Sequence, residues 1–283
     1  MAPSTSLTGF LNDLRLAHAE RCPCPSPKAV ERWFDAMMAL LFPGLADIDL
    51  APVGAFQGHV GLLRSSLVEL ISATKRGRAE AAALTERFFE QLPGIHADLV
   101  LDAEATYRGD PAAVDPEEVV RSYPGFIAVA AYRVAHALHG LGVEVLPRMV
   151  SEHAHARTGI DIHPAAKIGR HLCIDHGTGI VIGETAVVGD HVKIYQGVTL
   201  GGLSVRKEDA SIKRHPTVKD RVVLYAGATV LGGETVIGEG SVIGGNVWLT
   251  SSVPPNSRVV YQSRMYQGDS PELGGVLLQQ EAL

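Results

Sequence analysis

Two short segments of the chain carry side chains that could perform acid–base chemistry and bind a small charged molecule: Asp175-His176 and Arg214-His215. Imidazole has a pKa suited to removing a proton from a hydroxyl group at neutral pH, so His176 is a candidate general base. A guanidinium binds a carboxylate, and a carboxylate binds an ammonium group. The same residue types are also common on protein surfaces without any such role. The predicted secondary structure around them is therefore needed to choose between a functional site and an ordinary surface.

The C-terminal half of the chain predicts a rigid support, because aliphatic residues recur there every six positions. The first series is Ile162, Ile168, Ile174, Ile180, Ala186, Val192 and Val198. The second series is Val218, Leu224, Val230, Val236, Val242 and Trp248. A period of six with frequent glycine predicts a parallel β-helix, in which each hexapeptide forms one face of a triangular coil and the aliphatic residue points inward. Antiparallel strands would instead alternate with a period of two.

The two series are out of step with each other. Val218 follows Val198 by twenty residues, which is not a multiple of six, so residues 203–214 are expected to leave the coil as a loop. Half of the residues in this loop are charged. A charged excursion from a rigid coil either closes over a bound ligand or stays a solvated insertion, and the sequence leaves both interpretations open.

The N-terminal half has the three- and four-residue apolar spacing of amphipathic helices from about residue 27 to residue 155. Helices are predicted at 59–74, 79–91 and 125–141, with breaks at Pro93-Gly94, Gly109-Asp110-Pro111 and Pro124-Gly125. The predicted fold class is therefore α+β. We expect an α-helical domain over residues 1–157, a β-helix domain over 158–260 and a tail over 261–283.

Four motifs narrow the class of β-helix protein. They are Asp161-Ile-His-Pro-Ala-Ala-Lys-Ile-Gly, Ile174-Asp-His-Gly-Thr-Gly-Ile-Val-Ile-Gly-Glu-Thr-Ala, Gln196-Gly-Val-Thr-Leu-Gly-Gly and Lys213-Arg-His-Pro. Together they resemble the serine acetyltransferases, a family of hexapeptide-repeat acyltransferases, over about residues 108–257. The resemblance implies a left-handed parallel β-helix and the transfer of acetyl from acetyl-CoA to L-serine, which is the first step of cysteine biosynthesis from serine.

The resemblance also implies roles for individual residues. His176 would be the general base, and Asp161, fifteen residues earlier, the carboxylate that orients it. The remaining polar candidates bind the amino-acid substrate: Asp110 and Asp175 its ammonium group, Arg214 and His215 its carboxylate. Small residues along the coil are the candidates for contact with the pantetheine arm of acetyl-CoA, namely Gly201, Gly202, Ala226, Gly227, Gly244 and Gly245. No metal is expected.

Assembly and partners are implied in the same way. Members of the family form homotrimers or dimers of trimers with the site between neighbouring subunits, which would bring His176 and His215 of different chains into one pocket. L-cysteine is implied as a feedback inhibitor. Family members commonly dock a terminal isoleucine into O-acetylserine sulfhydrylase, but this chain ends in Leu283, which argues against that partner.

Two other functions remain open at this stage. Fold does not determine substrate, so a hexapeptide-repeat O-acetyltransferase with a sugar or another amino acid as acceptor is one alternative. The other is a β-helical protein like the zinc carbonic anhydrases, because His171 and His176 have the spacing of two zinc ligands. The third ligand would have to be His136 or His139, which precede the repeat.

Composition excludes several classes of partner. The net charge of -6 and the absence of a basic stripe argue against nucleic-acid binding. The apolar runs are too short to span a membrane, and the N-terminus lacks the pattern of a secretion signal, so we expect a cytoplasmic protein without a membrane partner. Cys22 and Cys24 have no second cysteine pair with which to complete a metal site.

Overall fold

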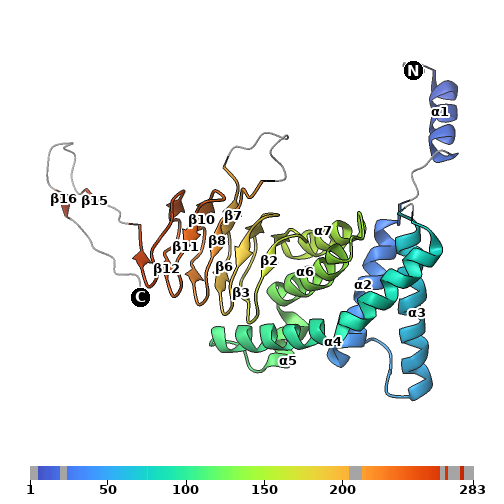
Figure 1. Ribbon diagram of the computed structural model, residues 1–283, viewed down its shortest axis with the longest axis horizontal. Coiled ribbons are helices and arrows are strands. Elements are labelled where there is room, and N and C mark those ends of the chain that lie inside the picture. Colours follow the sequence, from blue (N-terminus) through green and yellow to red (C-terminus); the bar gives the residue numbers. More distant parts are fainter. Residues whose placement is uncertain are drawn as a thin grey trace.

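Helices make up the first half of the chain and short parallel strands the second half (Figure 1). The computed structural model describes residues 6–19, 24–74, 76–203, 212–261, 265–266 and 275–276. The helices are α1 (Leu7–Ala19), α2 (Pro27–Leu41), the 3₁₀ helix η1 (Pro43–Leu45), α3 (Val53–Ser72), α4 (Arg78–Gly109), α5 (Pro116–Ser122), α6 (Pro124–Gly140) and α7 (Leu146–Thr158). Every helix within the described ranges is too short or too polar to span a bilayer.

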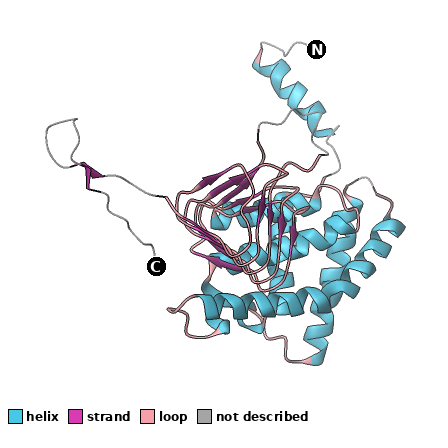
Figure 2. Ribbon diagram, turned by 60° about the vertical axis from the view of Figure 1, so that its left-hand side comes forward, coloured by secondary structure: helices cyan, strands magenta, loops and turns pink. Residues whose placement is uncertain are grey.

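The strands form three parallel sheets that are the faces of a prism (Figure 2). The first face contains β1 (Asp161–Ile162), β4 (Val181–Ile182), β7 (Thr199–Gly201), β10 (Thr229–Leu231) and β13 (Trp248–Leu249). The second contains β2 (Lys167–Ile168), β5 (Val187–Val188), β8 (Thr217–Val218) and β11 (Val236–Ile237). The third contains β3 (Cys173–Asp175), β6 (Lys193–Tyr195), β9 (Val223–Leu224), β12 (Val242–Ile243) and β14 (Arg258–Val259). An antiparallel pair, β15 (Met265–Tyr266) and β16 (Gly275–Val276), follows the prism. The predicted fold class is therefore confirmed.

The inward aliphatic positions follow the predicted period only in part. Ile174 points into the prism, but the next inward strand residue is Ile182, eight positions later instead of six. Ile180, at the preceding corner, is also buried, so an aliphatic residue still stands six positions after Ile174. The six-residue spacing in the sequence therefore does not reveal the two additional residues. The two additional residues lie in the turn that contains His176. The coil is thus expanded by two residues at the turn that holds the candidate base.

The last three members of the second series were assigned one residue too early. Ile237 and Ile243 are fully buried, whereas Trp248 is 68% exposed. The physical reason is a seven-residue step from Val230 to Ile237, which shifts the inward phase by one. A corner faces outward, so it can hold one additional residue. The inward residues of successive coils must still lie in register with one another.

A larger interruption lies between β7 and β8. Leu200 pairs with Val230, thirty residues later, while Ile182 pairs with Leu200 after only eighteen. The chain between these strands includes residues 204–211, which lie outside the described residues together with Cys22 and Leu283. The alternatives of a closing loop and a solvated insertion, predicted for residues 203–214, therefore both stay open.

One predicted helix break is wrong. Pro93 lies inside α4, which continues from Arg78 to Gly109. A proline in a helix interior costs about 3 kcal/mol. Buried residues on both sides of Pro93, among them Phe89, Leu92 and Ile95, continue one apolar face of the helix, and their packing offsets that cost. The other two breaks coincide with helix boundaries, since α4 ends at Gly109 and α6 begins at Pro124.

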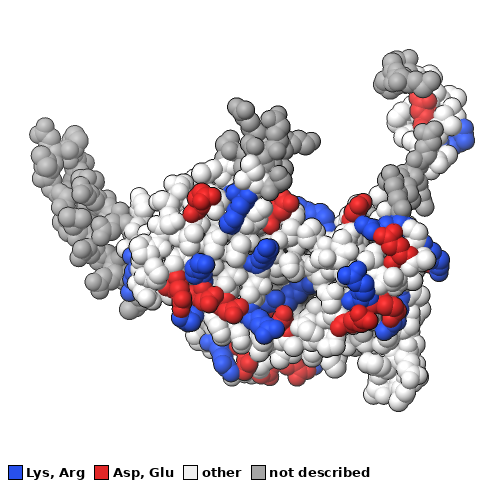
Figure 3. Space-filling view, in the orientation of Figure 1, with Lys and Arg blue, Asp and Glu red and all other residues white. Residues whose placement is uncertain are grey.

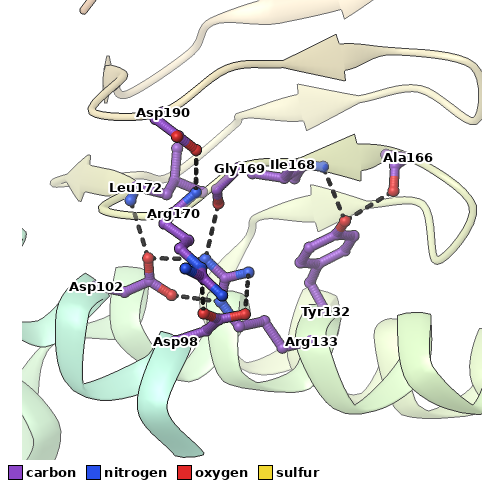
Figure 4. Close-up of polar contacts among 10 residues, drawn as sticks. All are labelled: Asp98, Asp102, Tyr132, Arg133, Ala166, Ile168, Gly169, Arg170, Leu172 and Asp190. Atoms are coloured by element: carbon purple, nitrogen blue, oxygen red, sulfur yellow. Dashed lines mark hydrogen bonds and ion pairs between the residues drawn. The ribbon is translucent and has the colours of Figure 1, made fainter. Parts of the chain in front are cut away.

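A buried group of polar residues joins the helices to the first coil (Figure 4). Arg133 of α6 pairs with Asp102 of α4, and both side chains are almost fully buried. Arg133 also donates to the carbonyl of Gly169 at 2.9 Å, and Asp102 accepts from the backbone N–H of Leu172 at 2.9 Å. We call these four residues the Arg133 joint. Because Leu172 directly precedes β3, the joint sets the position of β3 against α4.

Charged side chains of both signs are interspersed over the face of the molecule seen in Figure 3. Exposed ion pairs among the described residues include Arg108–Glu104 on α4 and Arg221–Glu239 on the coil. Exposed pairs of this kind contribute about 0–1 kcal/mol each to stability. The mixture agrees with the negative net charge and with the absence of a basic stripe in the sequence.

Candidate active site

Asp175 and His176 occupy the corner where the chain passes from the third face to the first, which we call the third–first corner. Asp175 is the last residue of β3 and is 7% exposed, whereas the side chain of His176 is 72% exposed. Asp175 Oδ1 lies 3.8 Å from His176 Nε2. His176 has a φ of 58°, a left-handed conformation that is uncommon for a residue other than glycine. The turn therefore presents an exposed imidazole beside a buried carboxylate.

Asp110 lies at the C-terminal end of α4. One of its carboxylate oxygens accepts a hydrogen bond from the hydroxyl of Tyr123 at 2.7 Å, and the other accepts from the N–H of Ala112 at 2.8 Å. These two hydrogen bonds, helped by the nearby charge of Lys193, hold the pKa of Asp110 below its usual value. The bond to Asp110 raises the pKa of Tyr123 to about 12. Asp110 is thus kept as a carboxylate near neutral pH.

Lys193 connects Asp110 to Asp175. Its Nζ lies 3.1 Å from Asp175 Oδ2 and donates at 2.6 Å to the carbonyl of Gly109, next to Asp110. Burial acts to lower the pKa of Lys193, but its hydrogen bonds to Tyr195 and Asp175 raise it above the usual value. Lys193 therefore stays charged and draws the end of α4 and the end of β3 together.

Two glycines allow the helices to come this close to β3. A Cβ atom on Gly109 would lie 2.8 Å from the sulfur of Cys173, and one on Gly125 would lie 2.5 Å from the carbonyl oxygen of Ile174. Contacts this short would force the helix ends away from the strand. Asp110, Asp175 and His176, which the sequence separates by up to 66 positions, form one cluster because α4 and α6 abut β3.

The contacts of Lys193 and Tyr123 with this cluster were not predicted from the sequence. For Lys193 a signal exists: it pairs with Cys173, one twenty-residue coil earlier, so it lies on the same face as β3. Tyr123 has no such signal, because its position depends on how α6 packs against the coil.

Asp161 lies at the same corner as His176. Gly179, just after His176, donates to the carbonyl of Gly159, just before Asp161, at 2.8 Å. No hydrogen bond joins Asp161 to His176 within the described residues. Asp161 instead lies beside Glu152 and His155, and one possible ligand atom from each of the three is within 4.8 Å of the others. The orienting role of Asp161 stays a prediction.

Arg214 and His215 lie at a different corner, where the chain passes from the first face to the second. Arg214 pairs with Glu184, and His215 stacks its ring over Gly183, where a Cβ atom would come within 2.1 Å of Nε2. Burial, together with the charge of Arg214, lowers the pKa of His215 to about 4. His215 and His176 are thus at opposite ends of β4, so one chain does not bring them to the same corner.

Most of the small residues predicted to contact acetyl-CoA share the third–first corner with His176. Ala226 and Gly227 connect β9 to β10, and Gly244 and Gly245 connect β12 to β13. Gly227 has a φ of 71°, and a Cβ atom on Gly197 one coil earlier would touch it at 3.5 Å. Gly201 and Gly202 instead lie at the other edge of the first face, at the end of β7. Ala226, Gly227, Gly244 and Gly245 therefore lie on the same corner as His176, beginning two coils beyond it.

The histidines considered as zinc ligands do not lie together at one site. His171 and His176 lie at opposite ends of β3, and His171 stacks on His191 with ring centroids 4.1 Å apart. His136 bonds to the carbonyl of Pro164 at 2.7 Å. Among the described residues, the one group of three or more side chains with the geometry to hold a metal ion is Glu152, His155 and Asp161.

Comparison with known proteins gives the same family as the motifs. No family model matches the chain. A serine acetyltransferase of Synechococcus elongatus is 50% identical over 200 residues, which are 69% of this chain and 62% of that protein. A serine acetyltransferase of Mycobacterium tuberculosis is 49% identical over 175 residues, which are 62% of this chain and 74% of that protein. The chain thus spans only about six tenths of the length of some curated relatives.

Solved structures extend the likeness to the helical half. Serine acetyltransferase isoform 3 of Entamoeba histolytica, in complex with cysteine, has a TM-score of 0.76 at 36% identity and covers 84% of both chains. The serine acetyltransferase of Neisseria gonorrhoeae in complex with serine has a TM-score of 0.57 at 30% identity, covering 83% of this chain and 94% of that chain. A serine acetyltransferase in complex with CoA has a TM-score of 0.55 at 32% identity, covering 69% of this chain and 80% of that chain. The chain belongs to the serine acetyltransferase family.

Proposed function

We propose that the protein transfers the acetyl group of acetyl-CoA to the hydroxyl of L-serine, giving O-acetyl-L-serine and CoA. The observation that carries this proposal is the cluster of Asp110 and Asp175 around the exposed imidazole of His176. Two carboxylates beside a base suit an acceptor that carries an ammonium group close to its hydroxyl. A sugar acceptor has no such cation. The solved relative that binds serine supports the same choice.

The reaction needs one proton to move twice. His176 accepts the proton of the serine hydroxyl while the oxygen attacks the carbonyl carbon of the thioester. The tetrahedral intermediate then expels the CoA thiolate, which takes the proton back from His176. Asp161 is the carboxylate that we expect to hold the imidazole during these steps.

Binding of the two substrates involves more than one corner of the prism. Arg214 and His215 would bind the serine carboxylate, and in a homotrimer these residues would come from a neighbouring subunit. The corner formed by Ala226, Gly227, Gly244 and Gly245 is the candidate path of the pantetheine arm, with Gly201 and Gly202 as further contacts, and a solved relative binds CoA. L-cysteine carries the same ammonium and carboxylate groups as serine, so it would compete for the site as a feedback inhibitor.

A panel of acceptors tests the proposal by thiol release from acetyl-CoA. L-Serine should react far faster than sugars or homoserine. Ethanolamine, which lacks the carboxylate, and 3-hydroxypropionate, which lacks the ammonium group, should both be poor acceptors. Preference for a sugar hydroxyl would overturn the choice of substrate.

A variant of the cluster sharpens the test. Asp110→Asn should lower kcat/KM for serine by about 10- to 150-fold, the equivalent of a hydrogen bond to a charged group. The same substitution should scarcely change the slow reaction of 3-hydroxypropionate, which has no ammonium group to lose. Asp47→Asn, at an exposed position in the helical half, is the matched control and should behave like the unaltered protein.

A further inference from the structure

Thr185 makes more hydrogen bonds to the Arg214-His215 segment than any catalytic candidate does. It lies between β4 and β5, one coil below His215. Its Oγ1 accepts from the backbone N–H groups of Arg214 at 2.9 Å and of His215 at 3.0 Å. The same Oγ1 lies 2.9 Å from Nδ1 of the His215 ring, and the backbone nitrogen of Thr185 lies 3.0 Å from that Nδ1. One threonine thus holds both the backbone and the ring of His215.

These contacts determine which ring nitrogen of His215 carries the proton. A backbone N–H can only donate, so Nδ1 of His215 must accept from Thr185 and therefore has no hydrogen of its own. The hydroxyl of Thr185 already accepts two N–H groups, which leaves its own hydrogen free to be donated to Nδ1. The neutral ring therefore carries its hydrogen on Nε2.

The surroundings of His215 favour this neutral form. His215 is 8% exposed, and its ring lies directly over Gly183. The charged and titratable groups that face it are Arg214, Lys213, Glu184 and His163, and burial followed by the charge of Arg214 keeps the pKa of His215 low. Within the described part of the chain no hydrogen bond reaches Nε2. Nε2–H is thus a donor that is left for a ligand.

We propose that Thr185 is a positioning residue that locks His215 in the neutral Nε2–H tautomer, so that the ring serves as a fixed hydrogen-bond donor to the carboxylate of the acceptor. That the ligand is an amino-acid carboxylate, and that the reaction is acetyl transfer, both rest on the proposed function. In this state neither ring nitrogen of His215 offers a free lone pair to the proton of the acceptor, because Nδ1 accepts from Thr185 and Nε2 carries the hydrogen. His215 therefore binds substrate and does not act as a base, and the proton transfer is left to His176.

The tautomer can be measured without any turnover. We suggest ¹⁵N NMR of protein labelled only at histidine, with the His215 signals assigned by their loss in His215→Gln. The expected result at pH 7 is a pyridine-type shift for Nδ1 and a pyrrole-type shift for Nε2, with no change to imidazolium on acidification to pH 5. An Nδ1–H tautomer, or an imidazolium at pH 7, would overturn the proposal.

Kinetics of two Thr185 variants test the consequence for binding. Thr185→Ser keeps the hydroxyl and should retain the tautomer and the KM for serine. Thr185→Val keeps the shape without the hydroxyl, so it should raise the KM for serine about 10-fold or more, with a smaller change in kcat and none in the KM for acetyl-CoA. Equal serine KM values in the two variants would overturn the proposal.

The two proposals fail in different ways. If the acceptor is not serine, the panel of acceptors fails while the NMR result for the unaltered protein and for Thr185→Ser still holds. If Thr185 does not set the tautomer, serine is still acetylated but the ring signals differ from those expected. Since the NMR measurement on the unaltered protein needs no substitution, it also stands if Thr185→Val does not fold.

Discussion

His176 is held by its turn and not by packing. Gly177 donates to the carbonyl of Asp175 at 2.7 Å and Thr178 donates to that of His176 at 3.0 Å, so the chain closes two very tight turns around the histidine. The same left-handed conformation recurs at other corners of the coil, as at His171 and Arg221. The turn directs the imidazole away from the prism, where an acceptor can approach it.

The prediction at this scale is that His176→Ala lowers kcat by about 10²- to 10⁴-fold, the usual contribution of a positioned base. Binding of acetyl-CoA should survive, which calorimetry with CoA can check. His171→Ala is the matched control, because His171 has nearly the same backbone conformation at the other end of β3. A zinc-dependent reaction would need both histidines, so equal losses in the two variants would contradict the role given to His176.

Among the elements, α4 and β3 matter most to the site, and the Arg133 joint holds them together (Figure 4). From the joint, α4 continues to Asp110 and β3 continues to Asp175. Burial raises the pKa of Asp102 despite its bonds to Arg133, and removal of the guanidinium would leave this carboxyl group buried without its cation. A charge left alone in this way is strongly destabilising.

We therefore expect Arg133→Met to lower the free energy of unfolding by about 3–5 kcal/mol, measured by chemical denaturation. Adding Asp102→Asn should recover part of the loss, because an amide still accepts from Leu172 and carries no charge. Arg170→Met removes an ion pair with Asp98 in which the arginine side chain is 66% exposed, and it should cost at most about 1 kcal/mol. Equal losses in the two single variants would mean that burial does not set the strength of the joint.

The period of six predicted the coil because the same inward position recurs on every face, as at Ile162, Val218 and Leu224. It did not predict the expansion at His176, because Ile180 is also buried and keeps the count of six from Ile174, although the next inward strand residue is Ile182. Helix packing was less predictable. Pro93 has the local signal of a break, and only the tertiary contacts of its neighbours keep the helix intact.

The candidate site was predictable where a motif contains the residue, as for His176 and Asp175. Lys193 lies outside the motifs and Thr185 lies within one, but both act through residues one coil away. Their roles therefore depend on coil lengths of twenty and thirty residues that differ from the regular eighteen. These lengths follow from strand pairing and not from local sequence.

At the scale of the whole molecule, the two histidines of the proposed mechanism lie at different corners of one prism. β4 separates them, with His176 before it and His215 after it. In the homotrimer proposed above, the third–first corner of one chain would lie against the first–second corner of the next. A site formed in this way would be incomplete in any single chain.

Mixed trimers test this arrangement. His176→Ala and His215→Ala should each be nearly inactive alone, but co-assembly in equal amounts should restore activity at about a quarter of the sites, since random mixing pairs an intact His176 with an intact His215 of the next chain at that frequency. Thiol release from acetyl-CoA with serine measures the recovery, and mixing the two preassembled variants without subunit exchange is the control. If both histidines acted within one chain, every site of the mixed trimers would still lack one of them, and co-assembly would restore nothing.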